Sequence, residues 1–233
     1  MFQVREQEII FNEKIAGDIY LMKISGSYEV KEGQFFMLKA EGRDMTLFRP
    51  ISIFDCDSYG VSFLYSVRGK GTEIFSKMKE SDTMLLHGPY GNGFPKTEGK
   101  IAMVAGGIGM APLYLTARRN PGSDLYIGIR EDLYSQEELQ LLEGLFEGCS
   151  VKFKIGGLIT EIIDFYKYDS VFTCGPEVMM KAVSELHQDV YVSLEKHMGC
   201  GLGACLSCSC KVGGKMVKVC KDGPVFKGTE VNF

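Results

Sequence analysis

The stretch CGLGACLSC at residues 200–208, followed by Cys220, is the most informative part of this sequence. Its spacing, C-x4-C-x2-C with a fourth cysteine downstream, is typical of plant-type [2Fe-2S] clusters. Glycine and alanine lie between the cysteines, so backbone amides would approach the cluster sulfurs closely. The pattern predicts a [2Fe-2S] cluster ligated by Cys200, Cys205, Cys208 and Cys220.

Two other interpretations of these cysteines stay open, a structural zinc site and unligated thiols. Zinc sites usually use C-x2–4-C pairs and do not need the surrounding glycines. Cys210 is a fifth thiol in the same stretch. The C-x4-C-x2-C spacing together with Cys220 already supplies four ligands, so this fifth thiol is one more than the cluster needs. We therefore expect Cys210 to lie outside the ligand set.

Composition excludes several classes of protein. The 233 residues are 45% hydrophobic and 24% charged, which is typical of globular chains. A formal charge of −4, with no basic block longer than two residues, argues against a nucleic-acid partner. The amino terminus lacks the apolar run of a signal peptide, and the longest uncharged run is too short and glycine-rich for a membrane span. We expect a cytoplasmic protein with no membrane contact, where clustered thiols indicate metal or redox chemistry.

The amino-terminal part, residues 1–97, has the pattern of a small antiparallel β-barrel. Short β-like runs alternate with glycine-containing turns. These runs cover residues 8–11, 19–24, 34–40, 51–55, 61–67 and 83–87.

Residues 98–194 change to repeated strand–helix pairs, which predict a doubly wound parallel sheet. The pairs are 101–105 with 111–119, 125–129 with 136–146, 151–155 with 159–166, and 171–173 with 177–187, before a last strand at 190–193. The expected fold class is therefore β plus α/β. Residues 195–233 form a small third domain that carries the cysteines and lacks any clear periodicity.

Two motifs in the first region suit a nucleotide ligand. Arg49 precedes Pro50, which biases Arg49 toward an extended conformation that would aim its guanidinium at a diphosphate. Gly71 and Thr72 lead into a predicted helix at 73–78, where a Thr72 cap and the first-turn amides suit phosphate. Taken alone, each motif is more typical of an ordinary turn than of a ligand site.

Two further loops lie at the carboxyl ends of predicted strands, where open α/β sheets bind their ligands. The first, AGGIGMAP at 105–112, is a glycine loop between a strand and a helix, as in sites for nucleotide pyrophosphates. The second begins with Cys174, which could equally be a small buried residue. Glu131 and Asp132, after the second strand of this region, would repel a 2′-phosphate and so favour NAD over NADP.

In this order, the motifs resemble those of the ferredoxin reductase superfamily of FAD and pyridine-nucleotide enzymes. The segment EKHMGCGLGAC at 195–205, with KVCKDGPVF at 218–226, is most similar to the electron-transfer subunits of bacterial NAD-dependent dihydroorotate dehydrogenases. The resemblance covers nearly the whole chain, and the cysteine segment is its most specific part.

The resemblance implies three cofactors, FAD, a [2Fe-2S] cluster and NAD. It assigns FAD to Arg49, Pro50, Ile51, Ser52, Leu64, Tyr65, Ser66, Gly71 and Thr72. It assigns NAD to Gly106, Gly107, Gly109, Cys174, Gly175 and Pro176, and the cluster to the four cysteines given above. Residues 155–158 are a shorter crossover than the family pattern leads us to expect, which would trim the NAD pocket.

The resemblance also implies a partner. NAD exchanges two electrons as hydride, whereas a [2Fe-2S] cluster passes single electrons, so a flavin must stand between them. Oxidation of dihydroorotate would take place on an FMN-containing (β/α)₈-barrel subunit, a fold of about 250 residues that this chain could not also contain. Electrons would then pass from FMN through the cluster and FAD to NAD⁺, in a heterotetramer with two copies of each subunit. No catalytic acid or base is assigned to this chain.

Two rival functions remain open. One is a reductase of the same architecture that serves a sulfide-, hydrogenase- or oxygenase-linked partner. The other is a nucleotide-sensing regulator with a zinc-bound carboxy terminus. The colour of the purified protein distinguishes the two, because flavin and iron–sulfur absorbance would exclude the zinc-bound regulator.

Overall fold

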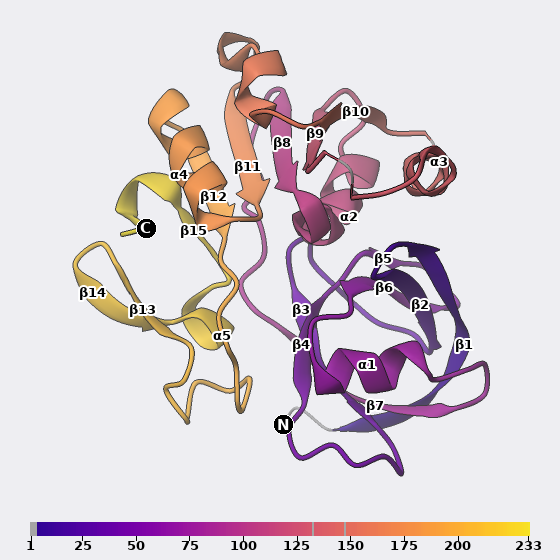
Figure 1. Ribbon diagram of the computed structural model, residues 1–233. Helices are drawn as coiled ribbons and strands as arrows, with labels where there is room; N and C mark the ends of the chain where they lie inside the picture. Colours follow the sequence, from indigo (N-terminus) through magenta and orange to yellow (C-terminus); the bar gives the residue numbers. More distant parts are fainter. Residues whose placement is uncertain (1–3, 132, 147) are drawn as a thin grey trace.

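Two β-sheets and a carboxy-terminal segment make up residues 4–131, 133–146 and 148–233, which are the residues that the computed structural model describes (Figure 1). The first sheet is antiparallel, with the strand order β4-β3-β7-β1-β2-β6-β5. Its strands are β1 (Arg5–Ala16), β2 (Ile19–Ser25), β3 (Phe35–Ala40), β4 (Arg49–Ser52), β5 (Asp55–Cys56), β6 (Gly60–Ser66) and β7 (Thr83–Tyr90).

This sheet curls into a half-barrel, which confirms the predicted antiparallel β architecture (Figure 1). The strand predicted at 8–11 is longer than expected, because β1 pairs with β2 on one side and with β7 on the other. Helix α1 (Lys70–Ser76) places Phe75 in the core of the half-barrel, where its ring meets the Tyr65 ring edge to face.

The second sheet has the strand order β10-β9-β8-β11-β12-β15, and its first five strands are parallel. The strands are β8 (Ile101–Gly106), β9 (Asp124–Ile129), β10 (Ser150–Ile155), β11 (Ser170–Cys174), β12 (Val190–Ser193) and β15 (Val225–Lys227). The helices are η1 (Gly107–Met110), α2 (Ala111–Arg119), α3 (Gln136–Gly144) and α4 (Glu177–Leu186).

Alternate residues of each parallel strand face opposite layers, as a doubly wound sheet requires. On one face, Met103 and Leu125 pack with residues of α2 and α3. On the other, Val104 and Val171 pack with Met180 of α4. The predicted doubly wound sheet is therefore confirmed.

The prediction of a helix at 159–166 is wrong. Two short 3-10 turns, η2 (Ile159–Ile162) and η3 (Phe165–Lys167), replace it. Ile163 and Phe165 are both buried against the sheet, whereas an α-helix would point residues two apart about 200° from each other. The Tyr168 hydroxyl then anchors the crossover by donating to Asp124 Oδ2 at 2.6 Å.

The carboxy-terminal segment is more firmly packed than its sequence suggests. It contains β13 (Ser209–Val212), β14 (Lys215–Lys218), α5 (Val219–Asp222) and η4 (Gly228–Glu230), and it adds β15 antiparallel to β12. Val219 is fully buried in the same hydrophobic cluster as the second face of the parallel sheet. A hydrophobic core therefore stabilises this segment, in addition to any group that its cysteines ligate.

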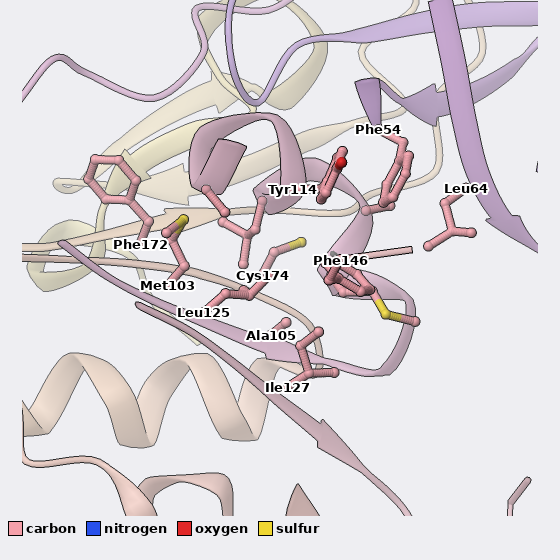
Figure 2. Packing of buried hydrophobic residues seen from close by; sticks show 14 of the residues in the cluster. Phe54, Leu64, Met103, Ala105, Tyr114, Leu125, Ile127, Phe146, Phe172 and Cys174 are labelled. Carbon is pink, nitrogen blue, oxygen red and sulfur yellow. The ribbon is translucent and has the colours of Figure 1, made fainter. Parts of the chain in front are cut away.

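An aromatic cluster joins the two sheets (Figure 2). Phe54, which follows β4, stacks on Tyr114 of α2 with ring centroids 4.2 Å apart, and both rings meet Phe146 edge to face. Beside this stack, Arg118 forms an ion pair with Asp55. Helix α2 is thereby fixed to the half-barrel.

We predict that Phe54→Leu lowers the free energy of unfolding by about 1–2 kcal/mol, because it removes ring stacking and leaves part of the site unfilled. Tyr59→Leu is the matched control, since Tyr59 is 76% exposed and its replacement should change stability by about 0.5 kcal/mol or less. Chemical denaturation of both variants measures the difference. Equal stabilities would contradict the assigned role of the stack.

None of the helices in the described ranges combines the length and apolarity needed to cross a bilayer.

Candidate functional site

A cavity of about 590 Å³ lies where the half-barrel meets the parallel sheet. Residues predicted to bind FAD line one side of it: Arg49, Pro50, Ile51, Ser52, Leu64, Tyr65, Ser66 and Thr72. These residues come from β4, β6 and the start of α1, which are distant in sequence. The volume falls within the range of about 300–1,000 Å³ typical of small-molecule sites.

Arg49 and Gly71 lie directly against each other at this cavity. A Cβ built on Gly71 would be 2.4 Å from Arg49 Nε, so no larger residue fits without moving the guanidinium. Arg49 Nη1 donates to the Leu47 carbonyl at 2.7 Å, which fixes the side chain at the rim. A fixed guanidinium with five donors suits a phosphate ligand.

Thr72 stabilises the start of α1, but from a different position than predicted. The helix begins at Lys70, so Gly69 is the N-cap residue and Thr72 is the third helical residue. Thr72 Oγ1 accepts hydrogen bonds from the Arg68 and Gly69 amides at 2.9 and 3.3 Å. The threonine thereby shapes the turn that borders the cavity.

The end of β12 and the residues that follow it also line the cavity, and none of them was predicted to bind a ligand. They are Ser193, Leu194, Glu195, Lys196, His197 and Met198. Their position in the sequence could have identified them, because they lie at the carboxyl end of a predicted parallel strand, where ligands of such sheets bind. Ile108, Ala111 and Pro112, from the glycine loop and the start of α2, also line the cavity, as do Phe35, Arg68 and Pro224.

The two loops predicted to bind NAD interlock through their glycines. A Cβ built on Gly109 would be 2.2 Å from the Cys174 carbonyl oxygen, and one built on Gly106 would be 2.5 Å from Pro176 Cδ. Gly175 has a φ of +147° and lies against the Gly106 backbone. Only glycine allows this close approach of the loops.

Gly107 differs from these glycines because its Cβ position is open, with no atom within 4 Å. Its φ of +54° lies in the left-handed region that favours glycine. An open, turned backbone beside the cavity is available to a ligand. Glu131 lies farther along the same sheet edge, with its carboxylate 3.3 Å from the Cβ position of Gly156, whereas Asp132 lies outside the described residues.

Cys174 is fully buried behind the cavity, and its Sγ lies 3.8 Å from Glu195 Oε1. Burial raises the pKa of the Cys174 thiol well above its usual range, and the Glu195 charge adds to the rise. Glu195 is exposed and lines the cavity, whereas Cys174 lies behind it.

The four predicted cluster cysteines lie in two pairs. Cys208 Sγ and Cys220 Sγ are 3.3 Å apart in the buried core, and both thiols are free. The Cys205 amide lies 3.4 Å from Cys200 Sγ in the exposed loop. Hydrogen bonds from Ser207 and Cys200 lower the pKa of Cys205 to about 6, which favours the thiolate that iron binds.

Tyr90 of β7 lies beside the cysteine segment: its ring is 3.3 Å from the Cβ position of Gly201, and it lines one concave pocket with Cys220. Burial raises its pKa to about 12, and the nearby Cys200 and Cys220 charges add to the rise. Four thiols arranged in two pairs are chemically suitable ligands for a site with two irons. Within the described ranges, no group of three or more Cys, His, Asp and Glu side chains has the geometry to hold a single metal ion.

Cys210 lies on β13, opposite Val217 of β14. It is half-buried and packs on the hydrophobic cluster that also contains Cys208 and Cys220. Its exclusion from the ligand set stays a prediction.

The comparisons with known proteins agree with this arrangement. Residues 195–232 match a family model described as the iron-sulfur cluster binding domain of dihydroorotate dehydrogenase B. A solved structure titled as an NADH-dependent reduced ferredoxin-NADP oxidoreductase, studied for flavin-based electron bifurcation, superposes with a TM-score of 0.79 at 27% identity. That match covers 97% of this chain and 89% of the other. The ferredoxin reductase in carbazole 1,9a-dioxygenase, at 17% identity and a TM-score of 0.67, shares the fold over 82% of this chain and 69% of its own.

Curated relatives extend the match to the full chain. The dihydroorotate dehydrogenase B (NAD(+)) electron transfer subunit of Clostridium acetobutylicum is 41% identical over 235 residues, which cover 97% of this chain and 96% of that protein. The subunit of the same name from Clostridium perfringens is 39% identical, with 95% of each chain covered. This chain therefore belongs to the family of dihydroorotate dehydrogenase B electron transfer subunits.

Proposed function

We propose that this chain accepts electrons from the oxidation of dihydroorotate on an FMN-containing catalytic partner and delivers them to NAD⁺. This activity is an oxidoreductase step in the formation of orotate for pyrimidine nucleotides. Membership of the family supports it, since the relatives are named as electron transfer subunits of an NAD(+)-linked dihydroorotate dehydrogenase. We place the complex in the cytoplasm as a heterotetramer with two copies of each subunit.

The chain has three sites, for FAD, NAD⁺ and the cluster, and we assign them in that order to domains at 1–97, 98–194 and 195–233. When bound, FAD and a [2Fe-2S] cluster supply the change from single-electron transfer to two-electron hydride transfer that NAD⁺ requires. Arg49 holds the diphosphate of FAD in this proposal, and Leu64 and Tyr65 of β6 border the same cavity. Cys200, Cys205, Cys208 and Cys220 hold the cluster, since four free thiols in two pairs fit its ligand requirement.

NAD⁺ binds at the interlocked glycine loops in this proposal. Gly106 and Gly109 let the loop before α2 pack tightly on Gly175, and the open Gly107 turn presents its backbone to the dinucleotide. Cys174 and Pro176 would support this site from the second loop, since the Cβ positions of Gly109 and Gly106 lie against them. Because Ile108 and Pro112 of the loop before α2 also line the cavity, NAD⁺ bound here would lie next to the proposed flavin site.

One observation carries the proposal, the continuity between the cavity and the cysteine pairs. Met198 lines the cavity, and Cys200 follows two residues later. Two residues span at most about 7 Å of extended chain. The Cβ position of Gly201 is also 2.7 Å from Met37 Cγ of β3, so the cysteine loop packs directly on the half-barrel. Electron transfer between the two sites needs this proximity.

The absorbance spectrum and iron content of the purified protein test the cofactor assignment. We expect flavin and iron–sulfur bands and about two irons per chain. A colourless protein that contains zinc would overturn the assignment. A protein with both cofactors that does not couple to a dihydroorotate-oxidising partner would instead favour a reductase serving another acceptor.

We predict that Arg49→Ala weakens FAD binding about 10-fold or more, because it removes a charge-assisted contact to the diphosphate. Flavin content after extensive dialysis measures the effect. Arg43→Ala is the matched control, since Arg43 pairs with Asp82 at the surface and does not line the cavity. Equal flavin retention by both variants would rule out the assigned role of Arg49.

A further inference from the structure

Asn92, in the loop that follows β7, forms four hydrogen bonds with the chain just beyond Cys220. Its backbone amide donates to the Gly223 carbonyl at 2.8 Å. Its side-chain Nδ2 donates to the Asp222 and Val225 carbonyls at 3.2 and 2.9 Å, and its Oδ1 accepts from the Val225 amide at 3.3 Å. These bonds join residues that are at least 130 positions apart in the sequence.

The three side-chain bonds require an amide. Two acceptors and one donor surround the Asn92 side chain, which fixes the orientation of its amide group. An aspartate of the same shape would place a carboxylate oxygen against both carbonyls, and an alanine would form none of the three bonds. Because Asn92 is exposed, each bond adds little to the stability of the whole chain. Their combined effect is to fix the backbone of residues 222–225.

This backbone continues directly from the buried cluster ligand Cys220. Asp222 ends α5, two residues after Cys220, and its carboxylate accepts a hydrogen bond from the Lys218 amide at 2.7 Å. Helix α5 is thereby closed into a compact turn, and Asn92 bonds the last residue of that turn. A shift of Asp222 would therefore move Cys220 relative to Cys208, whose Sγ lies 3.3 Å away.

The same backbone also borders the flavin cavity. Pro224 lines that cavity, and its carbonyl accepts from the Leu194 amide at 2.9 Å. A Cβ built on Gly91, which has a φ of +93°, would be 2.4 Å from Pro224 Cδ. Gln34 Nε2 donates to the Gly91 carbonyl at 2.9 Å, so the loop that carries Asn92 is itself fixed to the half-barrel. One chain of contacts thus connects the half-barrel, the cavity and Cys220.

We propose that Asn92 is a positioning residue for electron transfer, which holds Cys220 in a fixed place relative to the flavin cavity. It does not line that cavity, and it acts through the backbone of residues 222–225. Electron transfer slows steeply as the distance between two centres grows, and the surroundings of the cluster sulfurs help to set the potential. A looser connection would therefore impair transfer between the flavin and the cluster before it impaired either site alone. This inference rests on the proposed function.

The test compares Asn92→Asp with the parent in the full chain, with its flavin and iron present. NADH-driven reduction of the cluster, followed by visible absorbance and by its electron paramagnetic resonance signal, should be about 10-fold slower. An iron chelator should remove the cluster about 10-fold faster, as expected when a group that orients metal ligands is lost. Flavin content and NADH-driven dye reduction should not change, because Asn92 does not line the flavin cavity.

Asn120→Asp is the matched control for this exchange of amide for carboxylate. Asn120 Nδ2 donates to the Thr116 carbonyl at 2.8 Å at the end of α2. Helix α2 packs on the opposite face of the parallel sheet from Cys208 and Cys220. The control should therefore reduce and retain its cluster as the parent does.

Asn92→Ala is the second variant, because it removes the three side-chain bonds without adding a charge. It should show the same slower cluster reduction and faster iron loss as Asn92→Asp. If both variants matched the parent in these two rates, the positioning role would be wrong while the proposed function stood. Equal losses of dye reduction, flavin and cluster in both variants would show a general structural role and would also overturn the proposal. If NADH does not reduce a cluster in the parent chain, the proposed function itself fails, and this inference fails with it.

Discussion

Cys220→Ser is expected to abolish cluster binding while FAD binding and NADH-driven reduction of an artificial dye continue. Cys220 is 2% exposed, and its Sγ lies 3.3 Å from Cys208 Sγ, so serine would leave one buried thiol without its pair and offer a poor iron ligand. The flavin cavity does not include Cys220. Iron analysis and visible absorbance measure the first effect, and dye reduction measures the second.

Cys210→Ser is the matched control, because Cys210 packs on the same hydrophobic cluster as Cys208 and Cys220 but is not a predicted ligand. It should retain about two irons per chain. Loss of dye reduction by Cys220→Ser with FAD still bound would contradict the separation of the sites. Full iron content in Cys220→Ser would contradict the ligand assignment itself.

Gly109→Ala is expected to disrupt the nucleotide loops. The new Cβ would lie 2.2 Å from the Cys174 carbonyl oxygen and 2.5 Å from its carbon, and backbone atoms cannot rotate away as a side chain can. We predict a loss of about 3 kcal/mol in the free energy of unfolding. We also expect the KM for NADH to rise about 10-fold or more, because the loops must separate. Denaturation and steady-state dye reduction measure the two effects.

Gly144→Ala provides the control for this substitution. Its Cβ would meet no atom within 4 Å, and Gly144 ends helix α3, where alanine has the higher helix propensity. We expect stability that is unchanged or higher by about 1 kcal/mol or less. If Gly109→Ala matched Gly144→Ala in both stability and KM, the interlocked loops would not form the NAD site.

Features with a strong local signal could be predicted from the sequence. The cysteine spacing predicted four ligands, and the structure brings these thiols together in two pairs. The runs of β residues and the strand–helix alternation predicted the two sheets, because periodicity follows directly from which side chains must be buried. The residues from Arg49 to Ser52 gather at one cavity with Leu64 and Thr72, as expected of a common ligand.

Features that depend on distant contacts could not be predicted in the same way. Strand β15 joins β12 although only three residues form it, and its own sequence carries no sign of its partner. The crossover after β10 lacks a helix because its buried residues follow the shape of the sheet rather than a helical repeat. Glu195 lines the cavity because β12 ends beside it. Its position therefore depends on the order of the strands in the sheet and not on a local sequence pattern.

The most direct test of the account mixes this chain with the FMN-containing dihydroorotate dehydrogenase subunit and follows orotate formation and NAD⁺ reduction together. We predict that dihydroorotate reduces NAD⁺ only in the mixture, with about one NADH formed per orotate. The Cys220→Ser variant should block NADH formation in this assay. Orotate-coupled NAD⁺ reduction that proceeds equally well without this chain, or with Cys220→Ser, would contradict the central claim that electrons pass through its cysteine-bound cluster.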